Sequence, residues 1–310
     1  MLFKIIGSAA GGGFPQWNCN YTLSQGARNK LKNYTPRTQS SLIASSDGER
    51  WVLFNASPDL RQQILNTPQL YPKHDGPLRS TPIAAVVLTN ADVDHIAGLL
   101  TMRERQAFNI YATARVLNVL EQNPIFNVLN PELVHKYILP ITGQTTLNDS
   151  ENKPLNIDVE SFIVPGKVAL YMEDINQDNF GSKDGDTIGL RIYETNQDTS
   201  LFYIPGCAAI NDDLLSKING TQCLLFDGTL YTDDEMIKAG LGPKTGQRMG
   251  HISMSGPQGS IELLKDTSIE RKIFIHINNS NPVLNDTSPE RRAVEDAGWE
   301  IAFDGMEIKL

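Results

Sequence analysis

Short runs of apolar residues recur along the chain, and each run ends in polar or turn-forming residues. The runs are only four to six residues long and rich in β-branched side chains, which is typical of strands, several of them buried on both faces. The predicted strands span residues 2–6, 41–44, 51–54, 83–88, 201–204, 223–226 and 272–277.

Helical patterns lie between these predicted strands. We expect helices near residues 96–105, 114–122, 212–218, 259–264 and 289–297, and one more that starts with Ser57 as N-cap, Pro58 as first helical residue and Asp59 as early acid. This alternation predicts an α/β fold in which helices cover the sheets. The polar segments 148–153 and 173–186 are expected to be surface loops. Because neither resembles an interdomain linker, we expect residues 1–310 to form a single domain.

The composition narrows the range of partners. With 27 Lys and Arg against 36 Asp and Glu, the chain has a net charge of −9, which argues against nucleic acids or anionic membranes as partners and favours small solutes. Neither a signal peptide nor a run of about 18 apolar residues is visible. The three cysteines, Cys19, Cys207 and Cys223, are too few for a disulfide framework, so we expect a cytoplasmic protein.

Polar residues gather directly after the predicted strand 83–88. Asp92, Asp94 and His95 offer two carboxylates and an imidazole within four positions, where open α/β sheets place ligand sites. The alternative is purely structural: Asn90 and Asp92 would cap the following helix, Asp94 would be a turn acid and His95 a solvated residue.

A second polar signal is His276, near the end of the predicted strand 272–277 and before an Asn-rich loop. Together with Asp94 and His95 it would complete two histidines and one carboxylate, the facial set that leaves open positions on Fe(II). A core histidine hydrogen-bonded to backbone is the alternative.

Asp227 and His251 form a third candidate pair. Asp227 ends an apolar strand and His251 follows a glycine, so a carboxylate could orient the imidazole for proton transfer. The alternative is a turn-forming Asp-Gly and a histidine at a helix entry. His74 and His135 are expected to be structural or solvated.

The segment Asn90-Ala91-Asp92-Val93-Asp94-His95 resembles the H-x-H-x-D-H motif of the metallo-β-lactamase superfamily with its first two histidines replaced. A closer resemblance, nearly end to end, is to the pyrroloquinoline quinone (PQQ) biosynthesis protein B family. Its landmarks are residues 7–20 (GSAAGGGFPQWNCN), 36–41 (PRTQSS), 55–59 (NASPD), 249–251 (MGH), 276–279 (HINN) and 303–306 (FDGM). The resemblance implies an αββα sandwich of two mixed β-sheets flanked by helices.

The resemblance also implies a metal site and a reaction. Asn90 and Asp92 stand where the first-metal histidines would be, no histidine lies near residues 164–167, and Cys207 takes the place of the bridging aspartate. The ligands that remain are Asp94, His95 and His276, with Asp92 nearby. Whether Asp92 or Cys207 is a direct ligand stays open at this point.

The implied function is that of a mononuclear Fe(II), O2-dependent hydroxylase acting on the tyrosine-derived ring of a Glu-Tyr cross-linked precursor, with zinc as an alternative metal in the isolated protein. Asp227 and His251 resemble the acid–histidine relay of superfamily nucleases, which implies a role in proton transfer. Two alternatives are a soluble carrier that transports PQQ or its precursor, and a binuclear zinc hydrolase. The electron source, the ring position attacked and the oligomeric state, including a homo-oligomer, stay open.

One feature departs from the family pattern. Where the family often has C-x-C-x-x-C, this chain reads Cys19-Asn20-Tyr21-Thr22-Leu23-Ser24. A single thiolate cannot supply the three or four N or S ligands of a structural zinc, so no zinc is expected at Cys19. The departure also leaves open a related pathway with a different peptide-derived product.

Overall fold

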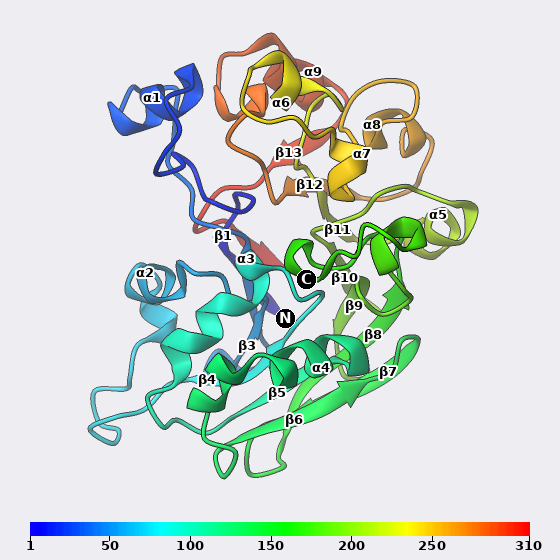
Figure 1. Cartoon of the computed structure of the whole chain (residues 1–310). Coiled ribbons are helices and arrows are strands. Elements are labelled where there is room, and N and C mark those ends of the chain that lie inside the picture. Colours follow the sequence, from blue (N-terminus) through cyan, green and yellow to red (C-terminus); the bar gives the residue numbers. More distant parts are fainter.

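A computed structural model describes all 310 residues. Two seven-stranded mixed sheets face each other, and helices cover their outer faces (Figure 1). The first sheet has the order β14 (Glu307–Lys309), β1 (Leu2–Gly7), β2 (Ser41–Ser45), β3 (Trp51–Phe54), β4 (Ile83–Val87), β5 (Phe108–Thr113) and β6 (Val134–Leu139). The second has the order β13 (Trp299–Ile301), β12 (Arg271–Ile275), β11 (Cys223–Asp227), β10 (Ser200–Ile204), β9 (Ile188–Glu194), β8 (Pro154–Ile163) and β7 (Gly143–Asn148). This is the αββα sandwich of the metallo-β-lactamase fold, as predicted.

The helices divide between the two outer faces. The first sheet is covered by α2 (Leu60–Leu65), α3 (Val93–Ile96), α4 (Ala114–Gln122) and the 3-10 segments η2 (Ala97–Met102) and η3 (Pro124–Val128). The second is covered by α1 (Thr22–Arg28), α5 (Asp212–Ile218), α8 (Ser260–Leu263) and α9 (Pro289–Asp296). The remaining helical turns are α6 (Glu235–Lys238), α7 (Gly246–Met249), η1 (Pro68–Leu70), η4 (Leu170–Met172), η5 (Asp178–Gly181) and η6 (Pro282–Leu284). None of the helices combines the length and apolar content that crossing a bilayer requires.

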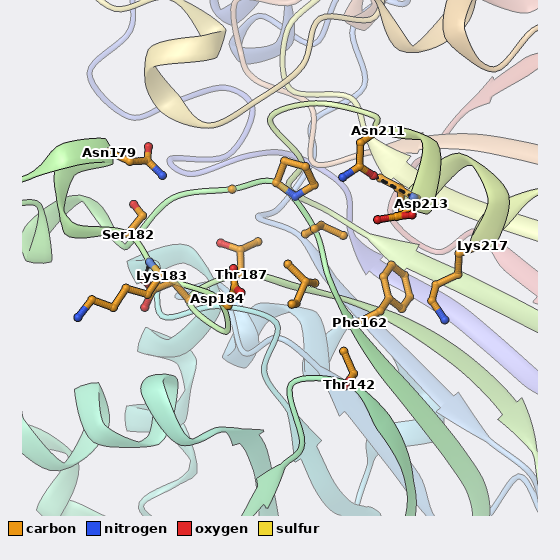
Figure 2. A pocket seen from close by; sticks show the side chains of 16 residues that line it. Thr142, Phe162, Asn179, Ser182, Lys183, Asp184, Thr187, Asn211, Asp213 and Lys217 are labelled. Carbon is orange, nitrogen blue, oxygen red and sulfur yellow. Dashed lines mark hydrogen bonds between the residues drawn. The ribbon is translucent and has the colours of Figure 1, made fainter.

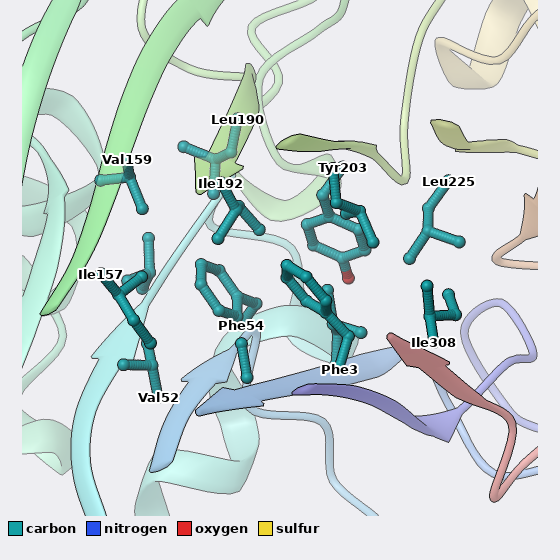
Figure 3. Packing of buried hydrophobic residues seen from close by; sticks show 14 of the residues in the cluster. Phe3, Val52, Phe54, Ile157, Val159, Leu190, Ile192, Tyr203, Leu225 and Ile308 are labelled. Carbon is teal, nitrogen blue, oxygen red and sulfur yellow. The ribbon is translucent and has the colours of Figure 1, made fainter. Parts of the chain in front are cut away.

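The core between the sheets follows from the two-residue period of each strand. In β3, Val52 and Phe54 point to the core between the sheets, while Trp51 and Leu53 join the cluster beneath the helices. Figure 3 shows Phe54 of the first sheet facing Ile192 of the second. Burial of each such side chain stabilises the fold by about 1.5–3 kcal/mol, and β3 is buried on both faces because it lies between two covered surfaces.

All seven strands predicted from apolar runs are present, with ends shifted by at most two residues, and the helices at 114–122 and 212–218 have the predicted bounds. Five longer strands were missed: β5, β6, β7, β8 and β9. The segment 173–186 contains only the short η5 turn and otherwise no regular structure, in agreement with the loop prediction.

Three local predictions are corrected. The helix expected at 96–105 already begins at Val93 and becomes 3-10 at Ala97, so its first turn contains Asp94 and His95. The helix expected to start at Pro58 begins only at Leu60, although the Ser57 hydroxyl does accept from the Asp59 N–H (3.3 Å) while donating to the Gln63 side chain (3.1 Å). The strand expected to reach residue 277 ends at Ile275, which leaves His276 outside it.

Candidate metal centre

The candidate residues lie at the carboxyl ends of parallel strands in both sheets. Asp94 and His95 follow β4, Asp227 is the last residue of β11, and His276 comes directly after β12. Strands β11 and β12 are parallel neighbours, and β4 lies in the parallel half of the first sheet. Parallel strands place their carboxyl ends at one edge, which is where open α/β sheets bind ligands. The loops after β4 and β12 therefore bring residues from both sheets to one place.

These side chains line a cavity of about 520 Å³, which we call the metal-centre cavity. Its wall includes Asp92, Asp94, His95, His251 and His276. The glycine run after β1 also reaches the cavity, since Gly11 lies against the Asp94 carboxylate.

Asp94, His95 and His276 form a group whose potential ligand atoms all lie within 4.8 Å of one another. Nε2 of His276 is 2.9 Å from Oδ2 of Asp94, and Nε2 of His95 is 3.8 Å from the same oxygen. The side chains of Asp94, His95 and His276 are only 15%, 2% and 6% exposed. His95 is therefore not the solvated residue of the structural alternative, and His276 is not merely bonded to backbone.

The surroundings of His95 leave one ring nitrogen ready to bind a cation. Nδ1 lies 2.6 Å from Oδ1 of Asn90, and because an amide oxygen can only accept, Nδ1 carries the proton. Nε2 is then a lone-pair donor, and it is buried without any hydrogen-bond partner. Burial lowers the pKa of His95 to about 4, which keeps the imidazole in the neutral form that a metal requires. The orphaned Nε2 fits a bound metal, and Asn90 fits the partner that orients a ligating histidine.

His276 is oriented in the same way from the second sheet. The Thr229 hydroxyl donates to Oδ1 of Asp227 (2.6 Å) and accepts from Nδ1 of His276 (2.8 Å). The backbone of His276 adopts a left-handed conformation with φ of 60°, which turns the chain away from β12 at this residue. Nε2 is thereby directed at Asp94.

The charges in this group favour a cation between Asp94 and His276. Burial opposes ionisation of Asp94, but His95 and His276 outweigh it and hold the pKa of Asp94 well below its usual range. Burial also opposes protonation of His276, but the hydrogen bond and charge of Asp94 raise the pKa of His276. When His276 is protonated, its positive charge lies where a metal ion would take over on binding.

Asp92 lines the same cavity but does not belong to the group of Asp94, His95 and His276. It precedes α3 as N-cap residue but makes no side-chain capping bond, and its carboxylate lines the cavity. Burial and the neighbouring charge of Asp94 raise the pKa of Asp92. Its role as a ligand stays a prediction.

Asp227, His251 and His276 form a second group of potential ligands within 4.8 Å. Oδ2 of Asp227 accepts from Nδ1 of His251 (2.7 Å), and the ring of His251 stacks on that of His276 at 5.3 Å between centroids. Burial opposes ionisation, but the charge and hydrogen bond of His251 lower the pKa of Asp227. Nε2 of His251 has no protein partner, so the pair presents one oriented imidazole nitrogen beside the metal ligands.

Gly250 sets the position of His251. It ends α7 in the left-handed conformation with φ of 87°, which a residue with a side chain rarely adopts. A Cβ at Gly250 would also approach Cγ of Lys167 to 2.9 Å. The chain therefore reverses tightly into His251.

The two candidate cysteines lie near the site in different ways. Cys207 is fully buried, its thiol donates to the Ala209 carbonyl (3.1 Å), and burial raises the pKa of that thiol. Its backbone N–H donates to Asp227 (2.9 Å), so Cys207 supports the carboxylate and belongs to neither ligand group. Cys19 lines the cavity, accepts a bond from the Tyr21 N–H and also belongs to neither group. The exposed His74 and His135 lie outside both groups too.

Sequence reasoning missed the two residues that orient the imidazoles. The sequence pattern indicates only a cap or a replaced histidine at Asn90 and gives no role to Thr229. The sequence signal for them was weak. Asn90 lies three residues after the buried strand β4, and Thr229 lies two residues after the buried strand β11. Their partners are 5 and 47 residues away along the chain, so only the fold identifies them.

A second cavity of about 520 Å³ lies beside helix α5 and is called the α5 cavity here (Figure 2). Figure 2 shows Asn211, Asp213 and Lys217 on one side of it and Lys183 and Asp184 on the other. No group of three metal-binding side chains lies in its wall.

The fold and the ligand groups define a protein of the metallo-β-lactamase superfamily, and the family model "Beta-lactamase superfamily domain" matches residues 50–277. Coenzyme PQQ synthesis protein B of Xanthomonas campestris pv. campestris (strain B100) is 48% identical over 310 residues, and that of Rhodopseudomonas palustris (strain BisB5) is 49% identical, each match covering 100% of both chains. The chain belongs to the coenzyme PQQ synthesis protein B family.

Solved structures agree with this assignment. Zn(2+)-bound PqqB from Methylobacterium extorquens has a TM-score of 0.93 and 47% identity, with full coverage of both chains. A diphosphatase from the PhnP family has a TM-score of 0.67 at 18% identity, covering 100% of this chain and 97% of its own, and this likeness shows the fold alone.

Proposed function

We propose that the protein is a mononuclear non-haem Fe(II) hydroxylase that uses O2 to hydroxylate a tyrosine-derived ring in the PQQ precursor. The observation that carries the proposal is the set of Asp94, His95 and His276, with an unpartnered Nε2 on His95. Two imidazoles and one carboxylate are typical of Fe(II) oxygenases and leave open positions for substrate and oxygen. When bound, Fe(II) supplies the redox chemistry with O2 that zinc lacks.

The surrounding protein groups support one metal at this set. The first-metal position of the superfamily holds Asn90, whose oxygen already accepts from His95 (2.6 Å) and from the Asp92 N–H (3.0 Å). The second ligand group shares His276, whose Nδ1 is bonded to Thr229. A second ion would have to displace these hydrogen bonds, which disfavours the binuclear hydrolase.

His251 is suited to move the phenol proton of the substrate. Its Nδ1 is bonded to the buried carboxylate of Asp227, which orients the ring, while Nε2 is free to exchange a proton with a ligand in the cavity. Asp227 itself also accepts from the Cys207 and Thr229 N–H groups (2.9 and 3.0 Å), so it stays ionised and fixed. Asp227 and His251 thus act as a relay beside the metal.

The size and lining of the cavity suit a single aromatic ring with polar substituents. Its volume of about 520 Å³ is in the usual range for small-molecule sites, roughly 300–1,000 Å³. Besides the metal ligands, its wall carries the side-chain amides of Gln16, Asn18, Asn20, Asn278 and Asn279. These groups offer both donors and acceptors to a substrate derived from amino acids.

The decisive experiment compares metals in one protein. Hydroxylation adds one atom of O2 to the ring and reduces the other to water with two electrons, which ascorbate supplies in the assay. Protein is stripped with chelator and reloaded anaerobically with one Fe(II) or one Zn(II) per chain, and O2 uptake and ¹⁸O incorporation are measured with a Glu-Tyr cross-linked substrate.

We expect the iron form to consume O2 in step with hydroxylated product and the zinc form to keep the fold without turnover. A faster zinc form, or product oxygen that comes from water, would support the hydrolase. Tight binding without turnover in the iron form would support the carrier.

A further inference from the structure

Two lysines line the metal-centre cavity in different electrostatic settings. Nζ of Lys167 is 2.6 Å from Oε1 of Glu173, whose other oxygen is held by Arg248 at 2.8 Å. Lys244 also lines the cavity and is partly buried, but no carboxylate lies within 4 Å of it and its ammonium makes no hydrogen bond to the protein. A lysine in the wall of a cavity with no protein partner is free to bind an anion.

The position of Lys244 is fixed by the helix that also positions His251. Lys244 directly precedes Thr245, the N-cap of α7, whose hydroxyl accepts from the Arg248 N–H (3.2 Å). The start of α7 is held further by Asp233, which accepts from the Gln247 N–H (2.8 Å). Four residues of helix then lead through Gly250 to His251. The backbone of Lys244 therefore has a fixed position relative to His251 of the proton relay.

The charges of the cavity wall indicate an anionic ligand. The only acidic side chains in this wall are Asp92 and Asp94, both at the metal end. A divalent ion bound by Asp94 and two neutral imidazoles keeps one positive charge, and Lys244 adds another, which exceeds the single negative charge of an ionised Asp92. The metal-loaded cavity is thus cationic, although the chain as a whole has a net charge of −9. The excess of positive charge is therefore confined to the cavity.

We propose that Lys244 determines specificity by binding a carboxylate of the substrate, whose reacting ring lies at the metal end of the cavity. The placement of the ring rests on the function proposed above. Lys167 is unsuited to this role because Glu173 already accepts from it, whereas a charge-assisted bond to Lys244 would be made only by the ligand. The ligand class is an aromatic compound with several carboxylates, its remaining oxygens bonded by the wall amides.

Binding is measured on the zinc-loaded protein, so that no turnover is required. The probes for isothermal titration calorimetry are PQQ, which carries three carboxylates, and its trimethyl ester, which has the same rings without the charges. The variants are Lys244→Met, Lys244→Arg and, as matched control, Lys238→Met. Lys238 ends the neighbouring helix α6, pairs with Asp234 (2.9 Å), is 69% exposed and does not line the cavity.

We expect Lys244→Met to weaken PQQ binding about 10-fold or more and to leave ester binding unchanged, while Lys244→Arg stays within about 3-fold of wild type and Lys238→Met matches it. Zinc content and thermal midpoint should be the same in all four proteins. Equal PQQ affinity of wild type and Lys244→Met, an equal loss of ester binding, or failure of the wild type to bind PQQ overturns the proposal. If the binding pattern is as expected but the iron form takes up no O2, the proposed hydroxylase activity is overturned and the role of Lys244 is not.

Discussion

The metal-centre cavity and the α5 cavity have the same volume of about 520 Å³, but their polar groups differ in what they are bonded to. In the α5 cavity, both oxygens of Asp186 are bonded by Arg115 (2.6 and 3.0 Å), and Lys217 pairs with Glu160 (2.7 Å). In the metal-centre cavity, Nε2 of His95 is buried and has no hydrogen-bond partner, and the partly buried Lys244 takes part in no ion pair. A buried polar atom without a partner is costly, so it marks where a ligand completes the structure.

Volume therefore does not distinguish the two cavities, whereas a fully buried ring nitrogen without a partner occurs in the metal-centre cavity alone. In the α5 cavity, the buried Asp186 and the Lys217 charge are paired within the protein itself. The following experiments test this contrast, starting with the largest expected effect.

Removal of a metal ligand should abolish function. We expect His276→Ala to lose both bound metal and turnover, since it removes the only member of the proposed ligand set that comes from the second sheet, and Asp94→Ala to do the same. Asp213→Ala in the α5 cavity is the matched control and should keep one metal per chain. Metal content by mass spectrometry checks this, and full metal retention in His276→Ala would contradict the ligand assignment.

Removal of the proton relay should slow turnover without loss of metal. We expect His251→Ala to reduce turnover roughly 100-fold or more, as loss of general acid–base catalysis does, while metal content stays at the wild-type level. His135→Ala, on the exposed face of β6, serves as control. If His251→Ala loses the metal instead, His251 is a ligand and the second group is the metal site.

Removal of the Asn90 oxygen should weaken the metal site without destroying it. Asn90→Ala leaves Nδ1 of His95 without its acceptor, so the ring loses its fixed tautomer, and metal affinity should fall about 10–100-fold. Competition with a chelator of known affinity measures the change. Asn211→Ala is the control from the α5 cavity and should leave the affinity unchanged. Wild-type affinity in Asn90→Ala would show that the amide does not orient the ligand.

The unfolding free energy of the protein should depend on pH through Glu235, the first residue of α6. Burial raises the pKa of this carboxyl to about 7, although it accepts from Ser280 (2.6 Å) and from the Tyr231 N–H (2.7 Å). The folded state therefore binds the proton more tightly than the unfolded state, and the free energy of unfolding should fall as pH rises from about 4.5 to 7. Glu235→Gln should remove this part of the pH dependence, a difference on the order of 2 kcal/mol by denaturant unfolding at pH 5 and 8. An unchanged pH profile in the variant would contradict the assignment.

The smallest effect is expected at Cys19. Cys19 belongs to neither group of potential metal ligands. Cys19→Ser should therefore keep the metal content and change the unfolding free energy by less than about 1 kcal/mol. Loss of one zinc per chain together with unfolding would contradict this prediction.

Several central strands could be predicted from the sequence because burial on both faces leaves a continuous apolar run, as in Trp51–Phe54 and Cys223–Asp227. The central strands β5, β8 and β9 could not, because Asn109, Asp158 or Arg191 interrupts their apolar runs, and the edge strands β6 and β7 could not either. β7 reads GQTTLN and only Leu147 is buried, while β6 exposes four of its six residues. Their pairing with β8 and β5 depends on contacts that no local pattern encodes.

The candidate site was predictable to a similar degree. Asp94, His95 and His276 stood out because ionisable residues follow buried strands, and the fold brings them together. Their partners Asn90 and Thr229 did not stand out, because asparagine and threonine after a strand usually form turns. Lys244 had no signal either, since the absence of a partner is visible only in three dimensions.

The two sheets contribute the candidate ligands separately, and Asp94 and His276 are 182 residues apart in the chain. At a synthesis rate of about 5–20 residues per second, roughly 10–40 s pass between the emergence of the first ligand and the last. The nascent chain cannot retain a metal on this set during that interval, so the ion is chosen only after β12 has joined its sheet. If the site binds iron or zinc as proposed, the ions available around the finished fold decide which metal a given molecule receives, and the metal supply of the producing cell then sets the iron-loaded fraction.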